Sequence, residues 1–343
     1  MTEARFTISP IESEGALIDR LTTPSSAVIE AVSQIDGPIM VLGVSGKMGP
    51  TLAELLVKAG AQRVIGVARF SDPTQRDYLE SVGVLTIKCD LLDDQALQDL
   101  PDVSHILLLA GHKFGSTGNE PLTWAINTLL PAKVMQRFSA SKIIYVSSGN
   151  VYRYCRVSHK GATESHPLEP IGEYAQSRLA GERVVQFYSE RNGTPVVIVR
   201  LFYATELRYG IILDIALKIQ HREPIDLATG YVNQIWQGDA NACFARSFPL
   251  CHSPASVINL TGRETLSVRE MAEHLGGLMD VAPIFDGQES DTTLLGNAEK
   301  AMDIFGPPKV TVAEMIEWVA WWVMRGGITL DKPTKYESRT GEF

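Results

Sequence analysis

The chain has 343 residues, of which 45% are hydrophobic and 21% are charged, and these values exclude both a disordered protein and one built from long apolar spans. Its net charge of -9 argues against a nucleic-acid partner, because a phosphate backbone attracts basic surfaces. The first ten residues lack the basic start and the apolar stretch of a signal peptide. We therefore expect a cytoplasmic protein that binds neither nucleic acid nor membrane.

Strand-like and helical patterns alternate through the first two thirds of the chain. Residues 1–37 hold two short helical patterns and are expected to form an N-terminal helical appendage. Six short runs rich in valine and isoleucine follow, at 38–44, 63–68, 84–90, 105–111, 142–148 and 195–201, with amphipathic segments between them. This alternation predicts an α/β fold, a Rossmann-like doubly wound parallel sheet over 38–201.

The rhythm loosens after residue 201. We expect 202–330 to form mainly a smaller C-terminal substrate lobe, with some elements returning to the Rossmann domain, such as the strand-like run 256–262. Residues 331–343 are polar and are expected to form a C-terminal tail. The four cysteines lack paired spacing and no Cys/His/Asp cluster has metal-ligand spacing, so we expect neither disulfides nor a metal.

A glycine-rich turn follows the first predicted strand. The stretch "GVSGKMG" places Gly43, Gly46 and Gly49 three residues apart where a strand passes into a helix. Glycines there allow a sharp turn and a close approach to a pyrophosphate, which the free N–H groups of the helix start then bind. We therefore predict a dinucleotide site that includes the three glycines and the intervening Ser45, Lys47 and Met48, against the alternative of a purely structural turn.

The end of the second strand indicates which dinucleotide is bound. An acidic residue there would bond the ribose of NAD, but this chain has Ala68 followed by Arg69. The guanidinium favours the 2'-phosphate of NADP, and Lys47 could add a second cation. We expect NADP in preference to NAD. The alternative is that both cations are surface charges and that Asp72 reaches the ribose.

The end of the third strand adds two candidate cofactor residues. Asp90 and Leu91 follow that strand and could border an adenine. Alternatively, Asp90 only caps the next helix.

A serine and a tyrosine follow in a characteristic order. "VSSGNVY" ends the fifth strand, and Tyr174 stands 26 residues after Ser148 in the helical stretch "YAQSRLAGERVV". With the glycine turn, "LLLAGHKFG" and "INTLLPAK", these segments resemble the extended short-chain dehydrogenase/reductase family, in particular its NAD(P)-dependent sugar epimerases and dehydratases. The resemblance implies that Tyr174 is the acid/base and that Ser148 bonds the same substrate oxygen. It also implies cofactor contacts, which we place at Ala110, Gly111, Lys113, Asn127, Tyr174, Arg178 and Phe202. For Lys113, a substrate oxygen is the alternative partner.

Arg178 departs from the family pattern, which has lysine four residues after the tyrosine. A phenol ionises near pH ~10, so a nearby cation is needed before it can act as a base at neutral pH. Arginine supplies that charge, but it is longer and planar and it keeps its proton. The alternative is that Arg178 is an exposed residue paired with Glu182.

The substrate residues also depart from the family pattern. Gly149 and Asn150 stand where the dehydratases carry an Asp–Glu pair, which favours epimerisation or hydride transfer over elimination. Tyr203 replaces an asparagine that binds nucleotide sugars, and "GYVNQIWQGDA" lacks their arginine. We expect a sugar, sugar acid or polyol rather than a nucleotide sugar. The candidate substrate residues are Asn150, Tyr203, Arg208, Asn233 and Trp236.

Several alternatives stay open at this point. Arg208 could form an ion pair with Glu206 or Asp214 instead of binding a substrate, and the aromatic and amide candidates could be core residues. His112 is expected to be a solvated loop residue. The protein could be a catalytically inactive NAD(P)-binding redox sensor, or an atypical reductase, since "GVSGKMG" is similar to the turn of dihydrodipicolinate reductases. The family resemblance also implies a homodimer built on the helices after the fourth and fifth strands.

Overall fold

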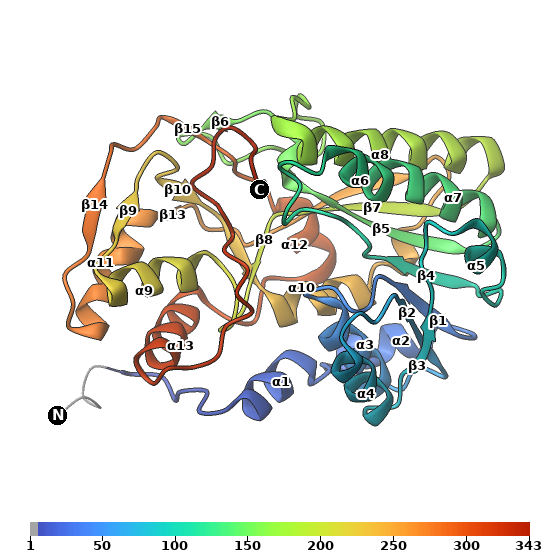
Figure 1. Cartoon of the computed structure of the whole chain (residues 1–343), viewed down its shortest axis with the longest axis horizontal. Helices are drawn as coiled ribbons and strands as arrows, with labels where there is room; N and C mark the ends of the chain where they lie inside the picture. The colour runs from blue at the N-terminus through green and yellow to red at the C-terminus, as the bar shows by residue number, and fades with distance from the viewer. Residues whose placement is uncertain (1–5) are drawn as a thin grey trace.

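A seven-stranded parallel sheet forms the centre of the molecule in the computed structural model, which describes residues 6–343. Its order is β12 (Ser256–Leu260), β7 (Val196–Leu201), β5 (Lys142–Ser148), β4 (His105–Leu108), β1 (Ile39–Leu42), β2 (Val64–Ala68) and β3 (Leu85–Lys88). All six pairings between neighbours are parallel. The predicted Rossmann-like sheet is confirmed, and the run at 256–262 returns to it as β12 (Figure 1).

Helices cover both faces of this sheet because each crossover between parallel strands carries one. One face packs on α3 (Gly49–Lys58), α4 (Pro73–Ser81) and α10 (Gln237–Ala245), and the other on α5 (Asp94–Gln98), α7 (Leu130–Arg137) and α8 (Gly172–Asn192). Before α7 come α6 (Glu120–Trp124) and the π-helical turn η2 (Ala125–Leu129). The last helix beside the sheet is α12 (Glu299–Phe305), which contacts β12.

The second lobe has a hydrophobic core of its own. Its helices are α9 (Ile211–His221), α11 (Val268–Met279) and α13 (Val312–Met324), which contact one another. Short paired strands complete it: β8 (Tyr203–Thr205) with β11 (Gln234–Trp236), β9 (Pro224–Asp226) with β14 (Ile284–Asp286), β10 (Tyr231–Val232) with β13 (Leu266–Ser267), and β6 (Cys155–Arg156) with β15 (Thr292–Thr293). This lobe therefore uses β6, which lies before α8 in the chain.

The N-terminal segment holds two helices, α1 (Glu14–Thr22) and α2 (Ser26–Ser33). Each begins after a serine, Ser13 or Ser25, whose side chain accepts a hydrogen bond from the first turn. Helix α1 contacts α3 and α10, and its Leu17 is buried in the core of the second lobe. The segment is thus packed against both lobes.

The segment 331–343, here called the C-terminal strap, crosses the front of the molecule between the two lobes (Figure 1). It contains no helix or strand, but it is not a free polar tail. Thr334 donates to Asp214 Oδ2 from its backbone nitrogen at 2.8 Å and from its hydroxyl at 2.5 Å. Arg339 Nη1 donates to the Thr292 carbonyl at 2.8 Å, and Phe343 is only 3% exposed. The strap is therefore fixed along its length.

The described residues contain neither a membrane-spanning helix nor a metal-binding cluster. Within residues 6–343, no helix is long and apolar enough to cross a membrane. Over the same range, no group of three His, Cys, Asp or Glu side chains is placed to hold a metal ion, and all four cysteines are free thiols.

Candidate active site

The glycine turn lies at the carboxyl end of β1 and leads into α3. Gly43 has φ +87°, and a Cβ there would meet the Ala110 backbone nitrogen at 2.7 Å, so a larger residue would force β1 and β4 apart. Gly49 packs just as closely against the Val44 backbone. Gly46 is exposed, and a Cβ there would meet the Gly43 carbonyl oxygen at 3.2 Å. The turn is therefore compact underneath and accessible above, which suits a pyrophosphate.

A cavity of about 200 Å³ lies on one side of this turn, over the ends of β1 to β4. Its lining contains most of the predicted adenosine-side residues: Gly43, Ser45, Gly46, Arg69, Asp90, Leu91, Ala110 and Gly111. Arg69 is exposed, and Asp90 accepts from the Leu92 backbone at 3.0 Å. The structure thus brings these predicted residues together.

Two alternatives that the sequence left open are wrong for this cavity. Asp72 does not line it, because Asp72 caps α4 by accepting from the Thr74 backbone nitrogen at 2.9 Å. Asp90 does not cap the following helix, because Asp93 occupies the cap position of α5. Arg69 and Asp90 therefore remain the polar side chains of this cavity's rim.

A second cavity, of about 300 Å³, lies on the other side of the glycine turn. The two share Gly43, Gly46, Leu109 and Gly111, so they form one groove across the carboxyl ends of the strands. The second cavity is lined by the remaining predicted turn residues Met48 and Gly49, and by Ser148, Asn150, Tyr174, Arg178, Phe202 and Tyr203. The predicted serine, tyrosine and arginine thus face one space.

Tyr174 and Ser148 come from α8 and the end of β5. Tyr174 is 9% exposed, and its ring packs edge-on against Phe343 of the strap with ring centroids 5.4 Å apart. The Ser148 hydroxyl donates to Asn150 Oδ1 at 3.0 Å and accepts from the Asn150 backbone nitrogen at 3.2 Å. Asn150 therefore orients the serine from within the same turn.

Arg178 is buried beneath the cavity at 3% exposure, one helical turn after Tyr174. It donates to the Val146 carbonyl, and Nη1 lies 3.5 Å from Asn127 Oδ1, while its buried Nε has no hydrogen-bond partner. The alternative pairing with Glu182 is wrong, because Glu182 binds Arg200 at 2.7 Å in the core. A buried guanidinium with an unused donor fits a site that binds ribose or phosphate oxygens.

Asn127 and His112 differ from expectation. Asn127 lines neither cavity and is fully buried in η2, where its side chain accepts from the His112 backbone nitrogen at 2.9 Å and donates to Ser177 at 3.0 Å. It is therefore a structural bridge rather than a direct cofactor ligand. His112 is not simply solvated: its Nδ1 lies 3.0 Å from Thr123 Oγ1, and burial lowers the pKa of its imidazole.

Lys47 points away from Arg69. Its Nζ donates to the Ala204 carbonyl at 2.6 Å and lies 4.1 Å from the centre of the Tyr209 ring, both in the second lobe. The expectation of a second cation beside a 2'-phosphate is therefore wrong, and Lys47 lines the cavity that holds Tyr174. Burial lowers the pKa of Lys47 to about 7.

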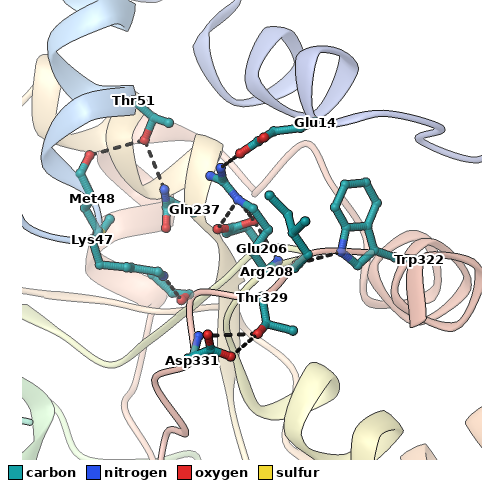
Figure 2. Close-up of polar contacts among 12 residues, drawn as sticks. Glu14, Lys47, Met48, Thr51, Glu206, Arg208, Gln237, Trp322, Thr329 and Asp331 are labelled. Carbon is teal, nitrogen blue, oxygen red and sulfur yellow. Dashed lines mark hydrogen bonds and ion pairs between the residues drawn. The ribbon is translucent and has the colours of Figure 1, made fainter. Parts of the chain in front are cut away.

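Three predicted substrate residues lie outside this cavity because tertiary packing uses them elsewhere. Asn233 is buried, with its side-chain nitrogen 2.6 Å from the Gly296 carbonyl, and Trp236 packs against Trp318 at 5.5 Å. Arg208 binds Glu206 at 3.1 Å and Glu14 of α1 at 2.7 Å (Figure 2). For Arg208, the ion-pair alternative with Glu206 is confirmed.

Several residues of the site carry no signal in the sequence. Phe114, Tyr209, Leu294 and Lys332 also line the cavity. Lys113 was predicted to bind cofactor, but its Nζ donates to the Thr334 carbonyl of the strap at 3.3 Å. No local motif marks these residues, since they come together only when the second lobe and the strap fold over the sheet.

Comparison with known proteins agrees with this geometry. Residues 39–212 match the model of the family described as "NAD dependent epimerase/dehydratase family", which is half of the chain. The chain belongs to this family. Family membership excludes the dihydrodipicolinate-type reductase, whereas the catalytic roles of individual residues stay predictions.

The relatives of this family member carry UDP-sugar names. An uncharacterized UDP-glucose epimerase of Bacillus subtilis is 28% identical over 184 residues, which is 48% of this chain and 55% of the relative. The match thus spans about half the length of that curated relative. The UDP-glucuronic acid 4-epimerase of Bacillus cereus in complex with NAD superposes with a TM-score of 0.68 at 19% identity, over 84% of this chain and 99% of that one. The UDP-glucose 4-epimerase of Thermotoga maritima gives 0.71 at 15% identity, with the same coverage. These two structural likenesses establish the fold.

Proposed function

We propose that the protein is an NAD(P)-dependent epimerase or oxidoreductase that acts on a carbinol or carbonyl group of a carbohydrate, with Tyr174 as the acid/base. The observation that supports this most directly is the shared cavity: Ser148, Tyr174 and Arg178 line one space that continues into the groove above the glycine turn. A nicotinamide bound in that groove supplies the hydride acceptor.

The residues of the chain divide the remaining work. Tyr174 removes the hydroxyl proton of the substrate as the hydride leaves the same carbon, and Ser148 donates a hydrogen bond to the oxygen. Arg178 lies one helical turn after Tyr174 and lines the same cavity, where it supplies the positive charge that lysine supplies in the family pattern. Return of the hydride to the other face of the ketone gives an epimer, whereas release of the ketone gives net oxidation.

The cofactor proposal keeps NADP ahead of NAD. Arg69 is the cation at the rim of the adenosine-side cavity, and Asp72 is occupied in its helix cap. The family is described as NAD-dependent, and the structural neighbour from Bacillus cereus contains NAD. The proposed preference for NADP therefore rests on a residue of this chain, Arg69. We also propose a cytoplasmic homodimer.

The size of the substrate is the point where the observations diverge. The names of the relatives lean against our expectation that the substrate is not a nucleotide sugar. What supports a smaller substrate is Tyr203, which lines the cavity at the position where the family's nucleotide-sugar enzymes carry an asparagine. Turnover of UDP-glucose and UDP-glucuronic acid, measured beside free sugars and sugar acids, decides between these two classes.

Replacing Tyr174 with phenylalanine tests the proposed function. Turnover should fall by roughly 10²–10⁴-fold, the usual contribution of a general acid/base. Cofactor affinity should persist, because the ring that packs on Phe343 remains. Reduced nicotinamide is followed by absorbance, and redox-neutral epimerisation by analysis of the sugar products.

Arg178→Lys is the companion variant. A loss of rate would mean that the site is built around the guanidinium, and a gain would mean that arginine limits it. If Tyr174→Phe retains full activity, the acid/base assignment is wrong. If the wild-type protein binds the cofactor but converts no sugar, the redox-sensor alternative is favoured, which Arg178 motivates by departing from the family's lysine.

A further inference from the structure

Positive side chains dominate the cavity beside Tyr174. Within the described residues, four cationic side chains line it, and no aspartate or glutamate does. The four are Lys47, Lys113, Arg178 and Lys332. Buried charges are normally paired, so this excess has to be balanced by a ligand or tolerated at a cost in stability.

Lys47 has only a neutral partner. Its ammonium group bonds the Ala204 carbonyl and lies over the Tyr209 ring. The carboxylate that affects it most is Glu206, which accepts instead from the backbone nitrogen of Arg208 at 2.9 Å and from its Nε at 3.1 Å (Figure 2). Lys47 therefore remains a cation with unused donors at the cavity wall.

Lys113, in the loop after β4, likewise has only a neutral hydrogen-bond partner. Its Nζ donates to the Thr334 carbonyl at 3.3 Å and lies 4.4 Å from the centre of the Phe343 ring. The carboxylate that affects it, Asp214, is bonded through Oδ2 to the backbone and hydroxyl of Thr334. Burial lowers the pKa of Lys113 to about 8.

We infer that Lys47 and Lys113 form a binding site for an anionic group of the substrate, of the carboxylate or phosphate class. This deepens the proposed function and rests on it. The two lysines line the same cavity: Lys47 lies 4.1 Å from the centre of the Tyr209 ring, and Phe114, the residue after Lys113, packs edge-on against that ring at 6.0 Å. Lys113 and Tyr174 contact the same Phe343 ring, from 4.4 Å and 5.4 Å, which places the anion close to the reacting carbinol.

The position of the lysines favours the substrate over the cofactor as the source of the anion. Lys47 is directed at β8 of the second lobe, and Lys113 at the strap. Neither lines the adenosine-side cavity with Ser45 and Arg69. Arg178, by contrast, lies beneath the nicotinamide side and keeps a free Nε for the cofactor.

Calorimetric binding to the cofactor-loaded protein tests the inference without requiring turnover. The probes are matched pairs: D-galacturonate with D-galactose, D-glucuronate with D-glucose, and galactose 1-phosphate with galactose. At least one acid should bind about tenfold or more tightly than its neutral partner. Comparison of the two uronate pairs with the phosphate pair identifies the class of anion. Binding of UDP-glucose tests whether the site accepts a diphosphate. If no acid binds better than its partner, including the case of no binding, the inference is overturned.

Variants of the two lysines localise the effect. Lys47→Met and Lys113→Met should each weaken the preferred acid by about tenfold or more, while leaving the neutral sugar and the cofactor unaffected. Lys142→Met is the matched control. Lys142 is exposed at the amino end of β5, whereas the cavity lies at the carboxyl ends of the strands. Loss of cofactor affinity with unchanged acid binding would assign the lysines to the cofactor and overturn the inference.

The pH dependence gives an independent readout. Lys47 faces Glu206, Arg208 and Lys113, and Lys113 faces Asp214 and Lys335. Since the pKa values of Lys47 and Lys113 are lowered to about 7 and about 8, both are charged below pH 7 and lose charge above it. Acid affinity should therefore fall between pH 6 and pH 9, with proton uptake on binding at pH 8, while affinity for the neutral sugar stays level.

Failure of this inference differs from failure of the proposed function. Tyr174-dependent conversion of neutral sugars, without preferential acid binding, would support the proposed function and contradict the anion site. Tight acid binding without any conversion would support the anion site and contradict the proposed enzymatic function.

Discussion

Arg69 is the side chain on which the choice of cofactor depends. It stands directly after β2, is exposed, and borders the cavity that also contains Asp90. A guanidinium bonds a 2'-phosphate with charge assistance but gains little from a ribose hydroxyl. Arg69→Ala should therefore weaken NADP by about tenfold or more and leave NAD nearly unchanged.

Dissociation constants for both cofactors, measured by quenching of tryptophan fluorescence, check this prediction. Lys88→Ala is the control, because Lys88 is an exposed cation at the end of the neighbouring strand that does not line the cavity. Tighter binding of NAD than of NADP by the wild-type protein would contradict the assignment.

Individual residues were predictable where spacing along one element decides their position. Ser148 at the end of β5 and Tyr174 in the first turn of α8 follow the order of a known pattern, and the structure places both at one cavity. Trp236 and Asn233 were misplaced because their sequence neighbourhood does not show which partner will bury them. The direction of the Lys47 side chain was likewise set by β8, which is distant in sequence.

The C-terminal strap supports the site from outside the Rossmann sheet. Phe343 packs on Tyr174 and Lys113, and its backbone carbonyl accepts from the Thr117 nitrogen at 3.3 Å. Phe343→Ala should lower turnover by at least about tenfold, because small displacements of a catalytic group have large effects on rate. Thermal stability should fall as well, since the replacement leaves a cavity.

Kinetics and a thermal melt of the variant measure both effects. Glu342→Ala is the matched control, as the neighbouring Glu342 is exposed and hydrogen-bonds Thr340 within the strap. Unchanged turnover in Phe343→Ala would show that Tyr174 is positioned without the strap.

The role of the strap could not be predicted from its composition. It has no hydrophobic period, and polar residues dominate it. Its anchors act singly: Thr334 on Asp214, Arg339 on Thr292, and Glu337 paired with Lys218 at 3.0 Å. Such contacts depend on the final positions of α9 and β15, which the local sequence of the strap does not contain.

Two large apolar side chains are exposed on the helices after the fourth and fifth strands of the molecule. Leu129 of η2 is 50% exposed and Phe187 of α8 is 56% exposed, and α8 packs directly against η2. These are the helices on which the resemblance implies a dimer. Leu129→Glu with Phe187→Glu should convert a dimer into a monomer, because buried carboxylates without partners are unfavourable at an interface.

Light scattering after size-exclusion chromatography measures the mass of each form. Ile284→Glu is the control, because Ile284 is an exposed apolar residue of β14 in the second lobe. A wild-type protein that elutes as a monomer, or a double variant that remains dimeric, would contradict the proposed interface.

At this scale the sheet was predictable, whereas the short strands of the second lobe were not. All six Rossmann runs form strands within a few residues of their expected bounds, because a buried parallel strand needs a continuous apolar run. The second lobe uses strands of two or three residues, too short to give a period. It also recruits α1 and β6 from earlier in the chain.

The burial of Phe343 has a practical consequence for expression. An affinity tag fused after this residue would have to leave from beside the Tyr174 ring, next to the phenyl group that both Tyr174 and Lys113 contact. Assays on such a fusion would then report a disturbed pocket. A tag joined ahead of α1 leaves that ring in place.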